Sequence, residues 1–159
     1  MNFEFSADQM QLKDIARKFL EKEDSVKRAR NVLEGEASYD EDLWSQIIEM
    51  GFTATAIPEE YGGLGLGYLE LCVIAEELGR SLAPTPFSSS VYLATEAILN
   101  FGDDSTKQAF LPALASGEKI GAFAHSESNT SPTEANIECT YSGGAISGTK
   151  IAVVDGDVA

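Results

Sequence analysis

Cysteine and histidine are scarce in this 159-residue chain, which has two cysteines and one histidine. Cys72 and Cys139 stand in apolar or strand-like surroundings without a CxxC or Cys/His spacing, so a disulfide framework and a zinc site are not indicated. His125 alone cannot supply an HExxH motif or a histidine-rich metal site. The sequence therefore predicts no metal centre and, most simply, a reducing compartment.

Positive charge is also in short supply. Eleven lysines and arginines stand against 26 acidic residues, a net charge of −15. A chain of this charge repels a phosphate backbone and an anionic membrane surface, so neither nucleic acid nor a membrane is an expected partner. Most of the basic residues crowd the first thirty positions, as Lys13, Arg17, Lys18, Lys22, Lys27, Arg28 and Arg30. This pattern favours a solvated helix face over a local anion-binding patch.

Long apolar runs and phosphate-binding motifs are missing. No run approaches the length of a membrane span, and the first nine residues lack the basic and apolar regions of a secretory signal. The sequence thus predicts a soluble cytoplasmic protein. No GxxxxGK motif occurs, and the glycines at 62–67 miss the GxGxxG spacing, which disfavours a nicotinamide-binding fold.

Helical periodicity marks the first part of the chain. Ser6 and Gln9 have the spacing of a capping box, and apolar residues then recur at i, i+3, i+4 and i+7 as Leu12, Ile15, Ala16 and Phe19. A second helix is predicted from Asp40 to Gly51, with a buried stripe of Leu43, Trp44, Ile47 and Ile48.

Three further helices are expected between residues 70 and 117. One carries Leu71, Ile74 and Leu78 and ends near Arg80, since Pro84 and Pro86 follow. The next is capped within 88–90 and ends at Gly102, and the last runs over 104–115, where Pro112 should kink or shorten it.

After Gly117 the periodicity changes to that of β-strands. Strands are predicted at 120–124, 137–141 and 151–154, with a turn at Gly143 and Gly144. The expected fold class is therefore α+β, with an all-α helical bundle at 1–117 followed by the first strands of a β-barrel-like domain at 118–159. Strands this few and short cannot enclose a core, so we expect that the chain is truncated or that another chain completes the sheet.

Four segments in this order carry a family resemblance: PEEYGGLG at 58–65, AEELGR at 75–80, KQAFLP at 107–112 and ASGEKIGAFA at 115–124. They resemble the acyl-CoA dehydrogenase family over its N-terminal helical domain and the start of its middle β-domain. The resemblance implies an oligomeric enzyme, homomeric or heteromeric, that uses FAD to convert an acyl-CoA thioester to the 2,3-enoyl-CoA. It implies an electron acceptor such as an electron-transfer flavoprotein. The family's base is usually a glutamate of the C-terminal bundle, so no catalytic residue is assigned in this chain.

The resemblance also assigns binding residues. Phe123, His125 and Ser126 match the strand end that faces the isoalloxazine ring, and the backbone of Val153 and Val154 matches a second flavin contact. On the substrate side, Ser131 corresponds to a phosphate or pantetheine contact, and Ser88 and Val91 to the wall of the acyl pocket. Without the resemblance, Ser126 reads as a turn residue, Ser88 and Val91 as a helix cap and core, and His125 as a packing residue.

The chain departs from the family pattern at several of these places. Ser128 stands where the family has proline, 129–133 reads NTSPT in place of a Gly-Ser-Asp group, and Ala152 and Val154 replace a tryptophan and a threonine. A wider substrate pocket is expected. These losses leave a second hypothesis open, a non-catalytic, flavin-poor structural subunit of a heteromeric dehydrogenase. A flavin monooxygenase or an acyl-CoA oxidase of the same architecture is a third.

Overall fold

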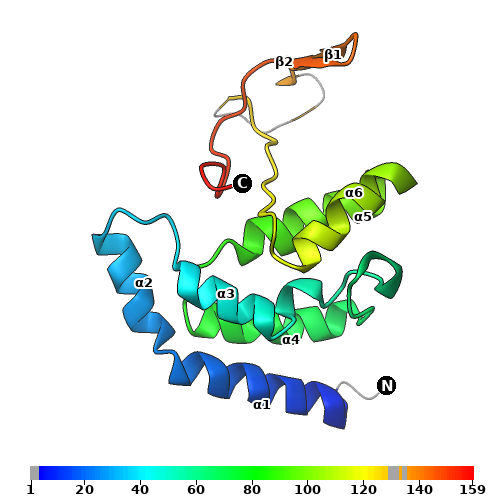
Figure 1. The fold of residues 1–159 in the computed structure, drawn as a ribbon. Coiled ribbons are helices and arrows are strands. Elements are labelled where there is room, and N and C mark those ends of the chain that lie inside the picture. Colours follow the sequence, from blue (N-terminus) through cyan, green and yellow to red (C-terminus); the bar gives the residue numbers. More distant parts are fainter. Residues whose placement is uncertain (1–3, 129–132, 134–135) are drawn as a thin grey trace.

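The helices lie between residue 7 and residue 115, and a small β-hairpin follows at 140–147 (Figure 1). The structure, a computed structural model, describes residues 4–128, 133 and 136–159. Its elements are α1 Ala7–Lys22, α2 Ser25–Glu34, α3 Glu41–Glu49, the 3₁₀ turns η1 Phe52–Ala54 and η2 Glu59–Tyr61, α4 Tyr68–Arg80, the π-helix η3 Ser88–Thr95, α5 Glu96–Phe101, α6 Asp104–Ala115, β1 Thr140–Ser142 and β2 Ala145–Ser147. The α+β class with a helical N-terminal part is confirmed.

The start of α1 has the predicted capping box. The Gln9 amide donates to the Ser6 hydroxyl over 3.1 Å, and the Ser6 amide donates to the Gln9 side chain over 2.9 Å. Two backbone donors of the first turn are thereby satisfied, which fixes where the helix begins.

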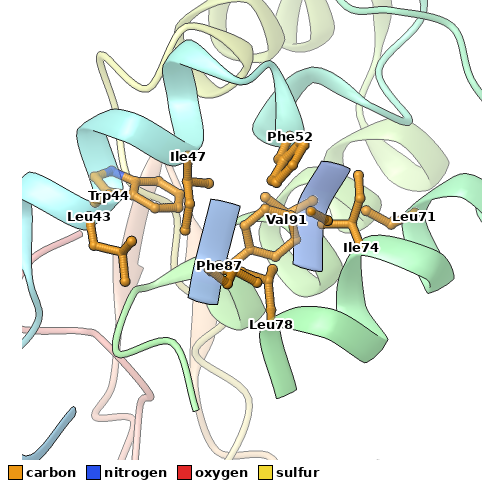
Figure 2. Packing of buried hydrophobic residues seen from close by; sticks show 11 residues of the cluster. Leu43, Trp44, Ile47, Phe52, Leu71, Ile74, Leu78, Phe87 and Val91 are labelled. Atoms are coloured by element: carbon orange, nitrogen blue, oxygen red, sulfur yellow. The ribbon is translucent and has the colours of Figure 1, made fainter. Parts of the chain in front are cut away.

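The main core lies where α3, α4 and η3 meet (Figure 2). The stripe predicted on the second helix is buried here as Leu43, Trp44 and Ile47 of α3. It packs with Leu71, Ile74 and Leu78 of α4 and with Phe87 and Val91. The rings of Trp44 and Phe87 meet edge to face with their centroids 6.4 Å apart, a favourable geometry for aromatic pairs.

Three details of the helical part differ from the sequence prediction. The α2 helix had not been predicted, because its residues are mostly polar, and in the structure only Ser25 among them is buried. The helix expected from Ser88 to Gly102 is divided into the π-helix η3 and α5, although it does end at Gly102. The α6 helix is not shortened at Pro112 but runs to Ala115, because Leu111 and Leu114 on either side of the proline are buried.

The strand predictions were largely wrong. Residues 120–124 and 151–154 are irregular, and the hairpin covers only the end of the strand expected at 137–141. In the hairpin, Tyr141 pairs with Ile146 across the turn at Gly143 and Gly144, which was predicted and in which both glycines have positive φ. Ile120, at the start of the run 120–124, packs against the main core, whereas Phe123 and Ala124 are exposed and have no strand beside them in the described structure.

Among the residues that the structure describes, no helix has both the length and the apolar character needed to cross a bilayer.

Candidate functional site

The segment after α6 crosses the π-helix η3 before it leaves the helices. Gly121 is the crossing point, because its amide donates to the Ser90 hydroxyl over 3.2 Å. A β-carbon at Gly121 would lie 2.5 Å from Cβ of Ala94, closer than two such atoms approach, so only glycine lets the backbone pass here. The direction in which residues 122–126 leave the helices is therefore set at this glycine.

Beyond the crossing, the chain presents hydrogen-bond donors that nothing in the described structure accepts. The amides of Phe123, Ala124, His125 and Ser126 donate to no described group, and neither does the Ser126 hydroxyl. Phe123 is 46% exposed, and its ring lies 5.5 Å from the His125 ring, centroid to centroid. Three of the predicted flavin contacts thus sit together on one accessible segment.

A second segment, distant in sequence, lies against the first. The Ile151 amide donates to the Ser126 carbonyl over 2.8 Å, and the Lys150 ammonium donates to the His125 carbonyl over 3.2 Å. In the described part of the chain, the amides of Val153 and Val154 also find no acceptor. The structure therefore places residues 150 and 151 against residues 125 and 126, where the two predicted flavin-facing segments approach each other.

An ion pair joins these two segments, and sequence reasoning had missed it. The Lys150 ammonium lies 2.6 Å from a Glu127 carboxylate oxygen. The same carboxylate accepts the amides of Glu138 over 2.5 Å and Cys139 over 3.1 Å. These bonds, that of Lys150 foremost, hold the pKa of Glu127 at about 2, against burial, which opposes the shift. A single Glu and Lys 23 positions apart carry no sequence signal that would have announced the pair.

The predicted substrate residues are less well grouped. Ser88 is exposed and lines a pocket of about 250 Å³ between η3 and α4. Val91, in contrast, is 3% exposed and belongs to the main core, so its side chain supports η3 from within. Ser131 lies outside the described residues.

An apolar groove of about 280 Å³ beside Phe123 had not been predicted. It is lined by Tyr92, Leu93, Glu96, Ala97, Asn100, Phe101 and Phe123. The spacing of Leu93, Ala97 and Phe101 along η3 and α5 was the available signal.

The polar groups of the site fit the flavin that the resemblance implies. The ring of a flavin carries carbonyl and imine acceptors along one edge, and such atoms need donors once the ring is buried. The free amides of 123–126 and 153–154 and the Ser126 hydroxyl are donors of this kind. Ala152 and Val154 offer no aromatic wall, so the ring would meet aliphatic side chains there.

Gly121→Ala is expected to disturb this site through the helices beneath it. The added methyl group must displace Ala94 or move the segment, which costs about 1 to 2 kcal/mol of the free energy of unfolding. The change can be measured by urea unfolding, together with amide chemical shifts at 122–126. Gly79→Ala is the control, because a β-carbon there meets nothing within 4 Å. If both variants lose the same free energy of unfolding, the close approach of Gly121 to Ala94 is not what requires glycine at 121.

Comparisons with known proteins agree with this picture. Residues 6–118 match the family model described as the N-terminal domain of acyl-CoA dehydrogenase. The mitochondrial isovaleryl-CoA dehydrogenase of Arabidopsis thaliana is 32% identical over 139 residues, which are 85% of this chain and 34% of that protein.

Two solved structures share the fold. Butyryl-CoA dehydrogenase from Megasphaera elsdenii gives a TM-score of 0.82 at 27% identity, over 100% of this chain and 44% of that one. A structure described as the electron transferring flavoprotein of Acidaminococcus fermentans contains a chain with a TM-score of 0.82 and 30% identity, over 98% of this chain and 42% of that one. The chain thus spans less than half the length of each of these proteins.

Proposed function

Because the chain belongs to the acyl-CoA dehydrogenase family, we propose that the complete protein uses FAD to oxidise an acyl-CoA thioester to the 2,3-enoyl-CoA. Residues 1–117 would then be the helical domain and 118–159 the opening of the flavin-facing β-domain. The single observation that supports the proposal is the group of amides at 123–126 that no described group accepts, on a segment bonded to the start of 151–154 through Ile151 and Ser126.

In this proposal the chain binds and orients rather than reacts. FAD, when bound, supplies the acceptor for the β-hydride of the thioester. The Ser126 hydroxyl and the amides around it hold the polar edge of the ring, and the exposed Phe123 ring keeps water from one side of it. Removal of the α-proton is assigned to a carboxylate outside this chain.

The acyl portion of the substrate fits the apolar groove that ends at Phe123. Leu93 and Phe101, both exposed, offer aliphatic and aromatic surface to it. We propose polar contacts to the thioester arm from Ser88 and Ser131, while Val91 supports the wall from the core. With Ala152 in place of a large ring, the site would accept bulky acyl groups.

Partners follow from the same proposal. An electron-transfer flavoprotein is the proposed electron acceptor, in keeping with the similarity to a chain of a structure described by that name. A homo- or hetero-oligomer is the proposed assembly. The cytoplasmic location stays a prediction, and the relative from Arabidopsis thaliana is described as mitochondrial.

The second candidate function is a flavin-poor subunit that supports a catalytic partner. Ala152 and Val154 favour it, because they remove an aromatic wall and a hydroxyl that the family presents to the flavin. Purification separates the two candidates: a yellow homo-oligomer supports the enzyme, and a colourless chain that gains flavin only with a paralogous partner supports the subunit.

Ser126→Ala tests the enzyme directly. In the complete protein, loss of this donor should weaken FAD binding roughly fivefold to tenfold, measured by quenching of flavin fluorescence. Ser142→Ala on the exposed strand β1 is the control and should bind FAD as the unmodified protein does. Oxidation of acyl-CoA by an artificial electron acceptor completes the test. A complete protein that binds no flavin would overturn the proposal.

A further inference from the structure

The C-terminal turn is anchored to the helices by a carboxylate. The Ser89 hydroxyl lies 2.5 Å from Oδ2 of Asp155, 66 residues away in sequence. Ser89 is fully buried on the π-helix η3, whereas Asp155 is half-buried. A separation this short is typical of a hydroxyl that donates to a charged oxygen, which is among the stronger hydrogen bonds in proteins.

Asp155 is held in a conformation that suits this contact. Its φ is +54°, in the left-handed region that aspartate tolerates better than most residues. The turn around it closes on itself, because the Gly156 amide donates to the Val153 carbonyl and the Val158 amide donates to the Asp155 carbonyl, each over 3.2 Å. The carboxylate is therefore presented by a compact unit and not by a loose end.

The span 152–154 has a fixed point at each end. On one side Ile151 is bonded to the Ser126 carbonyl, and on the other Asp155 is bonded to Ser89. Three residues separate the two anchors, so the path of Val153 and Val154 depends on both. Ser126, the partner of Ile151, belongs to the segment proposed to face the flavin. Ser89, the partner of Asp155, belongs to η3, which lines the apolar groove.

We propose that Ser89 is a positioning residue: by holding Asp155 it fixes the backbone of 152–154 against η3, and so couples the groove to the flavin-facing amides. The inference rests on the proposed function, since it assigns these amides to the flavin. Ser89 touches neither flavin nor substrate in this proposal.

Amide hydrogen exchange in the 159-residue chain tests the anchor without any flavin. Ser89→Ala should speed exchange at Ile151, Gly156 and Val158 about tenfold, the factor that corresponds to one hydrogen bond to a charged group. Asp155→Asn keeps an acceptor oxygen but removes its charge, so exchange should speed up by less than in Ser89→Ala. Ser45→Ala is the matched control, because it removes a serine hydroxyl bond to the Glu41 carbonyl within α3, away from the C-terminal turn. Unchanged exchange in Ser89→Ala overturns the anchor.

The complete protein tests the coupling. Ser89→Ala should weaken FAD binding several-fold, roughly as for loss of one neutral hydrogen bond, and should alter the visible circular dichroism of the bound flavin. A lower melting temperature with an unchanged flavin spectrum and affinity means a purely structural role and overturns the positioning inference. Absence of flavin from the unmodified complete protein overturns the proposed function, whereas the exchange measurement on the chain still decides the anchor.

Discussion

Glu77→Gln is expected to lower the free energy of unfolding by about 3 kcal/mol at pH 7. Glu77 of α4 is fully buried and accepts two hydrogen bonds from Arg17 of α1, over 2.7 and 3.0 Å, and one from Arg80 over 2.8 Å. Hydrogen bonding by Arg17 first, and then by Arg80, holds the pKa of Glu77 at about 2 in place of 4.5, although burial opposes the shift. At about 1.36 kcal/mol for each pH unit, the charged form contributes about 3 kcal/mol.

The same effect has a defined pH dependence. Because the folded pKa lies below the unfolded value, the stabilisation is fully present above pH 4.5 and is lost as the pH falls towards 2. Glutamine does not titrate. The free energies of unfolding of the two proteins should therefore converge as the pH falls from 4.5 towards 2. Urea unfolding between pH 7 and pH 2 measures the convergence. A difference that stays constant across this pH range would contradict the role of the charge.

The neighbouring residue provides the control for Glu77. Glu76 pairs with Lys13 over 2.8 Å, but its side chain is exposed. Glu76→Gln should therefore change the free energy of unfolding by less than about 0.5 kcal/mol, as is usual for exposed pairs.

Gly63→Ala should also destabilise the chain by about 3 kcal/mol, at the upper end of the cost of overpacking. A β-carbon at Gly63 would lie 1.9 Å from the carbonyl oxygen of Ile57 and 2.4 Å from its carbonyl carbon. These are backbone atoms of a fully buried residue that also accepts the Gly65 amide, so they have little freedom to move. Urea unfolding measures the loss.

Gly62→Ala is the matched control for Gly63→Ala. Gly62 has a φ of +79°, but a β-carbon there meets nothing within 4 Å. The alanine should cost about 1 kcal/mol, the penalty of the left-handed conformation alone. If the two alanines cost the same, close approach to Ile57 is not what requires glycine at 63.

The glycines at 62–67 also show how far sequence reasoning reached. Their spacing disfavoured a dinucleotide-binding loop, and the structure shows how their backbone packs. The loop folds back over residues 54–57, with the Leu64 amide donating to the Ala54 carbonyl over 2.9 Å. Close backbone approach of this kind depends on distant packing and cannot be recognised from spacing alone.

Helices were predicted well where a buried stripe and a cap coincide, as in α1 and α3. Glu76 and Glu77 are neighbours in the sequence but differ in environment, because Glu76 is exposed and Glu77 is buried with two arginines. Arg17, assigned to a solvated face, is one of those arginines. Ion pairs between helices depend on how the helices dock, which periodicity does not reveal.

Strands were predicted poorly because a strand is defined by its partner. The run at 151–154 is β-branched and apolar, yet it follows the backbone of Ser126 for only one hydrogen bond before it turns to Ser89. The segment does lie against residues 125 and 126, through Lys150 and Ile151. Composition could not indicate that Ala152 and Asp155 adopt positive φ and break the extended path.

The hairpin of β1 and β2 has a further consequence. Both strands are exposed on every residue, and the cross-strand pair Tyr141 and Ile146 is 76% and 81% exposed. Among the described residues, each strand pairs only with the other, which leaves the peptide groups along its outer side without a strand partner. Such an edge is a template on which an additional β-strand can grow, whether from a covering partner or, in concentrated solution, from another copy of the chain, as the first step of aggregation.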